Sequence, residues 1–456
     1  MRLAMIAALL STGALAETNL TPDEHDARAL EILTASVNFR SVKGDSAAAE
    51  HARYLARLLV AGGYAKADVE VDVNGASPTL VATYQGTTDA APLLLSGHMD
   101  VVEADPADWS RDPFTAVVEN GYVYGRGAVD NKFDNSMIVA TLLRLKSEAF
   151  KPARDIILVL SGDEETEMVT TESLAARFKG AHLVLNGDGG GGTLREDGTP
   201  LAYNLQTAEK TYADYEIAFT NPGGHSSRPS KENAIYRLAR AIERIGAYDF
   251  PAEASDTTRA FFRETGAMTS GPLGDAMKRY AENPKDKKAI KALRADPEYV
   301  GQLGTTCVAT MLGGGHALNA LPQRASVSVN CRIFPGVDPK DVERTLLDVV
   351  GDDAATIRRL ENTIAGPASP MREDVTAAVR KAIERRYPGL PVIPQMSAGA
   401  TDSLHFRAQG VDSYGVSGLF MKPSDDFSHG LNERAPIASI DGALDHWHVL
   451  ITALSQ

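Results

Sequence analysis

The sequence predicts an α/β fold in two domains: a mostly parallel sheet with helices on both faces, interrupted by an inserted α+β domain. The first reason is length, because 456 residues exceed the usual size of one hydrophobic core. The second is an alternation of strand-like and helix-like runs over residues 91–188, which resumes after Gly366 and Pro367. The third is the β-α-β-β-α-β order of the residues between, typical of an antiparallel sheet with helices on one face.

Periodicity in the large domain, residues 17–210 and 364–456, distinguishes its helices from its strands. Apolar residues three and four apart indicate helices, and short apolar runs that end in polar residues indicate buried strands. The predicted helices cover residues 26–38, 47–61, 135–149, 171–179, 374–386 and 438–454. The predicted strands cover residues 91–102, 155–165, 181–188 and 411–417.

The inserted domain, residues 211–363, carries a different pattern. TYADYEIAFT, at 211–220, alternates as a half-buried strand does. A charged, proline-containing stretch over 247–303 is expected to be an added helical segment, either capping the site, extending a dimer interface or doing neither. The remaining predictions are helices over 231–245 and 339–350, and strands over 305–312, 325–334 and 354–360.

The N-terminus is typical of an export signal. Met1 and Arg2 precede an apolar run from Leu3 to Leu15, and Ala14-Leu15-Ala16 fits a signal-peptidase site. The run is shorter than the roughly 20 residues that span a bilayer, which disfavours a membrane anchor. We therefore expect residues 1–16 to be a signal peptide and the protein to be periplasmic or secreted, with a frayed helix as the alternative.

Charge and cysteine content narrow the function classes. A formal net charge of −14 argues against binding nucleic acid or an anionic membrane surface. The two cysteines, Cys307 and Cys331, lie in predicted strands on either side of a turn-rich connection. In a hairpin they could face each other and oxidise in an exported protein, or remain two buried thiols. Either way, they lack the clustered spacing of a zinc–cysteine site.

Imidazole and carboxylate groups follow several of the predicted strands. In parallel α/β sheets, ligands bind beyond the carboxyl ends of the strands. Zinc prefers such ligands where it acts as an open Lewis acid, and a carboxylate can bridge two ions. The groups in question are His98, Asp100, Asp130, Asp163, Glu164, Glu165 and Asp188, with His429 far downstream in a polar loop.

Three of these segments, SGHMDVV, GRGAVDNK and SGDEE, occur in an order that resembles the two-zinc exopeptidase family. That family includes aminoacylase, acetylornithine deacetylase, succinyl-diaminopimelate desuccinylase and glutamate carboxypeptidase. The resemblance covers essentially the whole chain after the signal peptide, including the inserted domain. The stretch WSRDPFTAVVENGYVYGRGAVDNK is most similar to the carboxypeptidase and N-acyl-amino-acid hydrolase branch.

The resemblance implies a role for each of these residues. One ion would be bound by His98, Asp130 and Asp188; Asp130 would bridge to a second, completed by Glu165 and His429. Asp100 would orient His98, and Glu164 would be the general base. Many relatives carry glutamate where this chain has Asp188. The ions are expected to be zinc, with cobalt or manganese as alternatives.

The resemblance also assigns residues of the inserted domain. His225, in GGHSS, matches a histidine that reaches the active site of a dimer partner, where it would stabilise the oxyanion. Asn319 and Arg332 match positions that bind the substrate carboxylate or stabilise the intermediate. Thr401-Asp402 resembles another motif on the substrate side. A homodimer through the inserted domain is therefore expected.

Together these observations predict a hydrolase that cuts an amide bond beside a free carboxylate, as a carboxypeptidase or an N-acyl-amino-acid deacylase does. Its substrate would be a small peptide or an N-acyl amino acid. The alternatives are an aminopeptidase or dipeptidase of the same fold and a non-catalytic exported peptide-binding protein. The GDGGGG run, 187–192, formally fits a dinucleotide fingerprint, but the polar TLREDGTPLAY follows instead of a helix. No G-x-S-x-G elbow indicates a serine hydrolase.

Overall fold

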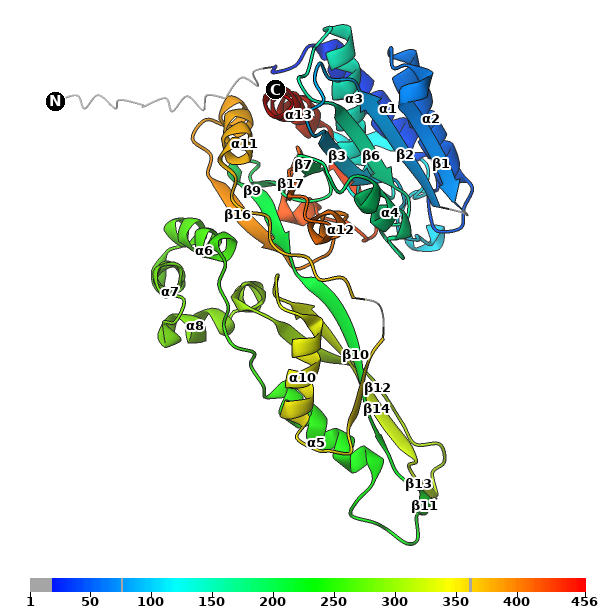
Figure 1. The fold of residues 1–456 in the computed structure, drawn as a ribbon, viewed down its shortest axis with the longest axis vertical. Coiled ribbons are helices and arrows are strands. Elements are labelled where there is room, and N and C mark those ends of the chain that lie inside the picture. The colour runs from blue at the N-terminus through cyan, green and yellow to red at the C-terminus, as the bar shows by residue number, and fades with distance from the viewer. Residues whose placement is uncertain (1–18, 75–76, 361–362) are drawn as a thin grey trace, which may run out of the picture.

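The computed structural model describes residues 19–74, 77–360 and 363–456. The predicted signal peptide lies outside these residues. The described chain forms a large α/β domain from which an elongated arm extends (Figure 1). No described helix is long and apolar enough to cross a membrane.

The large domain contains a ten-stranded mixed sheet in the order β1-β2-β6-β3-β7-β17-β9-β8-β18, with β16 also paired to β9. Its centre, β6-β3-β7-β17, is parallel, as the alternation of strands and helices predicts. The strands are β1 Val69–Asn74, β2 Ser77–Tyr84, β3 Leu93–His98, β6 Ile156–Ser161, β7 Leu183–Asn186, β8 Gly191–Leu194, β9 Pro200–Glu209, β16 Val392–Ser397, β17 Ser413–Gly415 and β18 Phe420–Met421.

Helices cover both faces of this sheet (Figure 1), because its central strands are apolar on both sides. In β3, Leu93 and Leu95 belong to the main core, whereas Leu94 belongs to a second core on the other face. The main core is closed by α1 Asp23–Val37, α2 Ala47–Ala61, α3 Lys132–Ser147, α11 Glu373–Arg386 and α13 Ile440–Leu454; the second by α4 Val169–Arg177 and α12 Ser403–Ala408.

The arm has the predicted β-α-β-β-α-β order. Its antiparallel sheet has the strand order β12-β14-β10-β15, and α5 and α10 pack on one face. Alternate residues of β14, from Ala325 to Ile333, are buried beneath these helices, as the alternating sequence requires. The elements are β10 Thr211–Thr220, α5 Ala234–Gly246, β12 Thr306–Gly314, β14 Arg324–Ile333, α10 Pro339–Val350 and β15 Thr356–Arg359.

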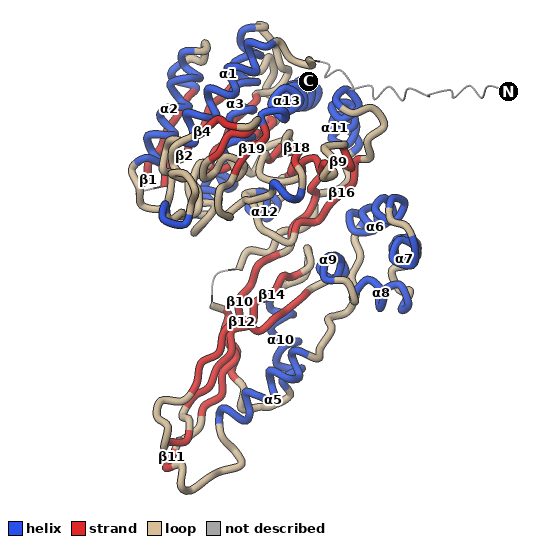
Figure 2. The backbone as a smooth tube through the Cα atoms, turned by 180° about the vertical axis from the view of Figure 1, so that it is seen from behind, coloured by secondary structure: helices blue, strands red, loops and turns tan. Residues whose placement is uncertain are grey.

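Cys307 and Cys331 are register partners in β12 and β14, and they form a disulfide. The strand register thus decides between the two states of the cysteines that the sequence left open. The arm ends in a two-stranded pairing of β11 (Gly224–His225) with β13 (Ala320–Leu321), far from the large domain in both backbone views (Figures 1 and 2).

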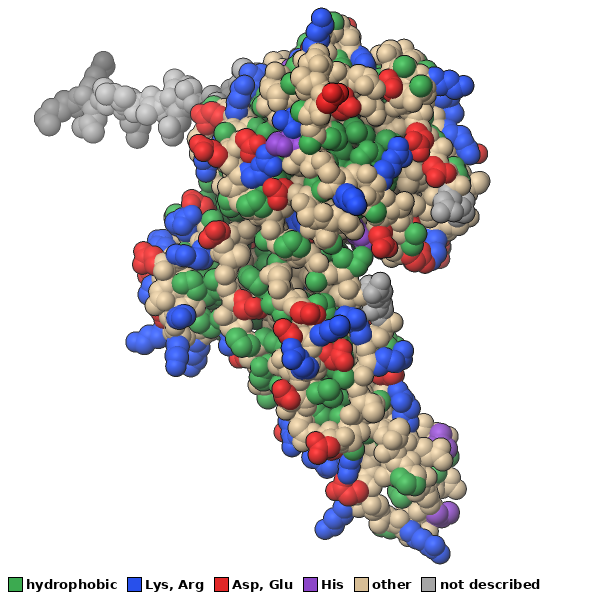
Figure 3. All heavy atoms as spheres, viewed as in Figure 1, with side chains coloured by type: hydrophobic (Ala, Val, Ile, Leu, Met, Phe, Trp, Pro, Cys, Tyr) green, Lys and Arg blue, Asp and Glu red, His purple; other side chains and the backbone are tan. Residues whose placement is uncertain are grey.

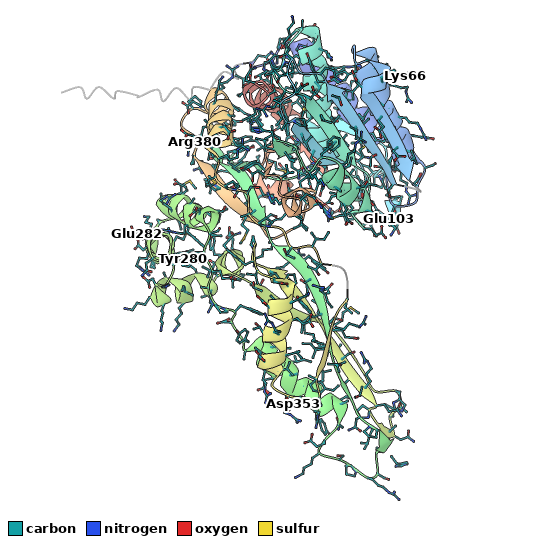
Figure 4. All side chains as sticks on the ribbon, in the orientation of Figure 1. Lys66, Glu103, Tyr280, Glu282, Asp353 and Arg380 are labelled. Carbon is teal, nitrogen blue, oxygen red and sulfur yellow. A yellow bond between two sulfur atoms is a disulfide. The ribbon has the colours of Figure 1, made fainter. Side chains whose placement is uncertain are left out.

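The stretch 247–303 is helical, as expected, and has its own small core around Phe262 and Tyr280. Tyr280 is labelled in Figure 4, and its hydroxyl donates a hydrogen bond to the carbonyl of Glu253. The first of these helices packs against β16, so the segment lies beside the large domain. The helices are α6 Asp256–Met268, α7 Gly271–Glu282, α8 Lys287–Arg294 and α9 Pro297–Val300.

Several strands carry no clear sequence signal. The TLREDGTPLAY segment, expected to be polar and turn-rich, contains the end of β8, a turn and the start of β9. No helix follows the GDGGGG run, which agrees with the rejection of a dinucleotide site. A three-stranded sheet was also not predicted, and it consists of β4 Val117–Glu119, β5 Tyr122–Tyr124 and β19 Arg434–Pro436.

Candidate metal centre and active site

The predicted ligands converge at the carboxyl ends of three neighbouring strands. His98 is the last residue of β3, Glu164 and Glu165 follow β6, and Asp188 follows β7. Asp130 lies two residues before α3. Because β6, β3 and β7 are adjacent and parallel, their ends meet at one edge of the sheet.

His98, Asp130 and Asp188 form the first ligand group. The Nε2 atom of His98 lies 2.9 Å from Oδ1 of Asp130 and 3.7 Å from Oδ1 of Asp188. Suitable ligand atoms of all three residues lie within 4.8 Å of one another. The residues predicted to bind the first ion are therefore brought together within this chain.

Asp130, Glu165 and His429 form the second group. The Nε2 atom of His429 lies 3.1 Å from Oδ2 of Asp130 and 3.0 Å from Oε1 of Glu165. One carboxylate oxygen of Asp130 thus faces His98 and the other faces His429. This is the arrangement required of a carboxylate that bridges two ions.

The chemistry of the donor set fits divalent cations. Four carboxylates share the cluster with only two imidazoles; Glu164 is buried and the other three acids are partly buried. Burial, together with the neighbouring acids, raises the pKa of Asp188 to about 8. Hydrogen bonds to Asp130 and Glu165 raise the pKa of His429 to about 10. Cations held here would offset the carboxylate charge and favour the deprotonated ligands.

Backbone geometry also marks the His429 loop. His429 has a φ of +61°, in the left-handed region that non-glycine residues seldom adopt. Its side chain is 55% exposed, so burial of the imidazole does not account for this conformation. Residues held in such conformations are enriched at functional sites, and here the conformation accompanies an imidazole that faces two acids.

Glu164 is buried beside both groups. Burial raises the pKa of its carboxyl well above the usual range, and Asp188, Asp402 and Glu165 add to the effect. Suitable atoms of Glu164 also lie within 4.8 Å of those of His98 and Glu165. A carboxylate that takes up a proton readily and faces the metal ligands is suited to general acid–base chemistry.

Asp100 lies beside His98, as expected, and also contacts the turn after β6. The ring Nδ1 of His98 lies 3.1 Å from the backbone carbonyl oxygen of Asp100 and 3.5 Å from its carboxylate. The two carboxylate oxygens accept hydrogen bonds from the backbone N–H groups of Glu164 and Glu165. Asp100 therefore connects the turn that carries Glu164 to the strand that carries His98.

A buried ion pair that the sequence did not indicate joins the Asp130 and His429 loops. The carboxylate of Glu433 lies 2.7 Å from Arg126 and accepts hydrogen bonds from the backbone N–H groups of Gly127, Val129 and Asp130. Arg126 also donates to the carbonyls of His429 and Gly430. Arg126 lies within the GRGAVDNK motif, but nothing in the local sequence distinguishes Glu433.

The other predicted residues are dispersed. Arg332, in β14, donates to the carbonyl of Ala398 and stacks 4.7 Å from the ring centroid of Tyr212. Tyr212 lines a cavity together with Glu164, so Arg332 packs against one wall residue of that cavity. The Asp402 side chain is buried and accepts hydrogen bonds from Ser161 and Thr171.

His225 and Asn319 lie at the distal end of the arm, where Figure 3 shows histidine side chains on the surface. The Nδ1 atom of His225 accepts a hydrogen bond from the backbone N–H of Ser227. The chain does not bring either residue to its own metal centre. Any role there requires a second chain.

Two imidazole–carboxylate groups that share one acid at the end of a parallel sheet define a metallopeptidase-type hydrolase. The chain belongs to the peptidase family M20/M25/M40, whose model matches residues 94–453.

Comparisons with individual proteins agree. The chain is 26% identical to a probable carboxypeptidase S-like 2 of Dictyostelium discoideum, over 82% of this chain and 74% of that one. It is 26% identical to the mouse N-fatty-acyl-amino acid synthase/hydrolase PM20D1, over 78% and 73%. The fold superimposes on the M20 metallo-carboxypeptidase Sso-CP2 of Sulfolobus solfataricus with a TM-score of 0.67, at 21% identity and covering 94% of this chain and 99% of that chain.

Proposed function

We propose that the protein is an exported hydrolase that uses two divalent metal ions, zinc by preference, to release an amino acid with a free carboxylate from a small peptide or N-acyl amino acid. The observation that carries this proposal is the Asp130 carboxylate, which is shared between His98 and His429 beside the buried Glu164. Imidazole and carboxylate ligands in this number suit zinc, and cobalt or manganese could occupy the same ligands.

The reaction divides between the ions and the protein. Ions held by the two ligand groups would polarise the scissile carbonyl and make water acidic enough to lose a proton near neutral pH. Glu164 accepts that proton from the attacking water and passes it to the amine nitrogen as the C–N bond breaks. Asp100 holds the backbone of Glu164 and Glu165 in place throughout.

Arg332 is proposed to bind the substrate carboxylate. A guanidinium group suits this role because its N–H groups can hold both carboxylate oxygens. In the structure it stacks on Tyr212, which lines the cavity that contains Glu164. The carboxylate of the leaving amino acid would then lie on the Glu164 side of the centre.

A homodimer would supply His225 and Asn319. Both lie at the far end of the arm, where another subunit's large domain could receive them. The edge strand β12 supports dimerisation, since Val308, Met311 and Leu312 are at least 59% exposed on it. An imidazole brought to the partner's centre could stabilise the developing oxyanion. The Cys307–Cys331 disulfide supports the proposed export, because disulfides persist in oxidising compartments.

The test measures amino-acid release from N-acyl amino acids and from blocked or free peptides. The protein is used as purified, after chelation, and after zinc, cobalt or manganese is restored. We expect metal-dependent release confined to substrates with a free α-carboxylate. Release that needs a free amine and tolerates a blocked carboxyl would identify an aminopeptidase instead. No release despite two bound ions would favour the binding-protein alternative.

The role of Glu164 has its own test. Glu164→Gln should lower kcat by at least roughly 100-fold, the usual contribution of a general acid or base, while the metal content stays unchanged. Glu167→Gln is the matched control, because Glu167 lies on the same turn but is exposed and pairs with Lys43. Wild-type kcat in metal-loaded Glu164→Gln would remove Glu164 from the mechanism.

A further inference from the structure

Two separate cavities adjoin the metal centre. One, of about 520 Å³, includes Asp130 and Asp188 in its lining; the other, of about 440 Å³, includes Glu164 and Glu165. Both have the size of a small-molecule site. They share no lining residue, so the two parts of a substrate that spans the centre would meet different surroundings.

The proposed reaction assigns one part of the substrate to each cavity. Glu164 must reach the leaving amine, and Arg332 stacks on Tyr212 in the wall of the same cavity. The amino acid that carries the free carboxylate therefore belongs in the cavity of Glu164. The acyl part is left to the larger cavity, which we call the acyl cavity.

One wall of the acyl cavity consists of backbone alone. It is formed by the glycine run 189–192, where an added Cβ atom would meet close neighbours or a left-handed backbone. A Cβ atom on Gly192 would lie 2.0 Å from the ring of Phe420, and one on Gly189 would lie 2.4 Å from Oε1 of Gln206. Gly190 and Gly191 have φ angles of +76° and +98°, which disfavour any other residue. This wall offers peptide groups, not hydrocarbon, to a ligand.

The facing walls carry amides and hydroxyls. Gln395 and Gln206 are register partners on the adjacent parallel strands β16 and β9, and Asn204 lies two residues before Gln206. Gln206 is engaged with Glu209, and the amide of Asn204 reaches only Thr193, at 3.4 Å. Among the described residues, the side-chain amide of Gln395 has no hydrogen-bond partner. Lys422 and Asp426 at the edge are of opposite sign, and the other acids of the lining are engaged elsewhere: Asp134 accepts a hydrogen bond from Ser417, and Asp130 and Asp188 belong to the candidate metal groups.

Hydrocarbon is a poor match for this lining. An alkyl chain would displace water from the amides of Gln395 and Asn204, and the hydrogen bonds between that water and the amides would not be replaced. Sites built from hydrogen-bonding groups reject ligands that lack such groups. Apolar side chains contribute only a minority of the lining: Val129, Leu419, Met421 and Pro423.

We propose that the acyl cavity selects a short, neutral, hydrogen-bonding acyl group, such as an amide-bearing penultimate residue of a peptide, over a long hydrocarbon acyl chain. This inference rests on the proposed function and narrows it to peptide hydrolysis. It separates the chain from its PM20D1 relatives, which are named for fatty-acyl amino acids.

The experiment fixes the leaving amino acid and varies the acyl part among acetyl-Gln, acetyl-Leu and dodecanoyl. The zinc-loaded full-length protein should show a kcat/KM for acetyl-Gln roughly tenfold above that for acetyl-Leu, the effect of one lost hydrogen bond, and higher still relative to dodecanoyl. Equal rates, or a preference for dodecanoyl, would overturn the inference.

Variants locate the selectivity. Gln395→Leu should lower kcat/KM for acetyl-Gln about tenfold and leave acetyl-Leu unchanged or improved. Asn204→Leu provides a second variant on the neighbouring strand. Gln409→Leu, an exposed glutamine outside the cavity, is the matched control and should change nothing. A uniform loss on all substrates in both cavity variants would contradict a role in selection.

Failure of the inference can be distinguished from failure of the proposed function. Zinc-dependent release of the amino acid without a polar preference overturns only the acyl selectivity. Absence of release from every substrate, with both ions bound, overturns both.

Discussion

Replacing Glu433 with glutamine tests how the two metal-binding loops are held together. Glu433 is fully buried and pairs with Arg126, whose side chain is 3% exposed. The substitution keeps the shape of the side chain but removes its charge. Loss of the charge leaves Arg126 without a countercharge. The new NH2 group cannot accept a hydrogen bond, so at least one backbone N–H of Gly127, Val129 or Asp130 loses its acceptor.

The expected cost follows from this burial. Breaking a buried ion pair by neutralising one partner costs about 3–5 kcal/mol, because the other charge stays buried and uncompensated. Since Glu433 also positions the backbone of Asp130, and Arg126 that of His429, metal affinity should fall by about 10–100-fold, as it does when groups that orient ligands are removed.

Two measurements check these expectations: denaturant unfolding of the metal-loaded protein, and metal affinity by competition with a chelator. Glu70→Gln is the matched control, because Glu70 forms a two-pronged pair with Arg177 in which both side chains are about half exposed. Exposed pairs contribute about 0–1 kcal/mol. If Glu433→Gln unfolds like Glu70→Gln and keeps its metal affinity, the joining role of the pair is refuted.

Three further predictions concern other parts of the molecule. Replacing Cys307 and Cys331 by alanine should cost about 3 kcal/mol of unfolding free energy, because their separation of 24 residues closes a loop of moderate length; an unchanged denaturation midpoint would contradict this. Burial lowers the pKa of His446 to about 4. The neutral imidazole's contribution to the free energy of unfolding is therefore complete above pH 6.5 and is lost as the pH falls from there towards 4. The stability lost over this pH range is about 3 kcal/mol. The urea midpoint of His446→Gln should therefore fall less steeply with decreasing pH than that of the wild type. If His225 acts in a partner subunit, mixing inactive His225→Ala and Glu164→Gln proteins should restore about a quarter of wild-type activity through subunit exchange; exchange without recovery would refute it.

Local sequence patterns were enough to predict the order of most elements, and with the family resemblance they identified the candidate metal ligands. A short apolar run such as LLLSGH, bounded by turn signals, favours a buried strand, and the polar residues that follow it emerge where parallel strands end. His98, Glu165 and Asp188 could therefore be placed together before any coordinates were known. The alternation within 211–220 likewise indicated a half-buried strand of the inserted domain.

Features that join distant parts of the chain depended on the tertiary structure. Arg126 and Glu433 are 307 residues apart, and no local pattern relates them. The hairpin of β8 and β9 was missed because its polar residues are held by pairing to neighbouring strands rather than by intrinsic propensity. The acyl cavity has the same origin, since it combines strands from both halves of the large domain.

The sequence by itself determined the chemistry of this protein, because ligand type and strand periodicity are written in neighbouring residues. Only the tertiary structure decided the geometry: the pairing of Cys307 with Cys331, the position of His225 at the end of the arm, and the polar lining of the cavity beside Asp188. The physical reason is that strand register and chain path are set by burial summed over the whole fold, and a local segment carries only part of that information.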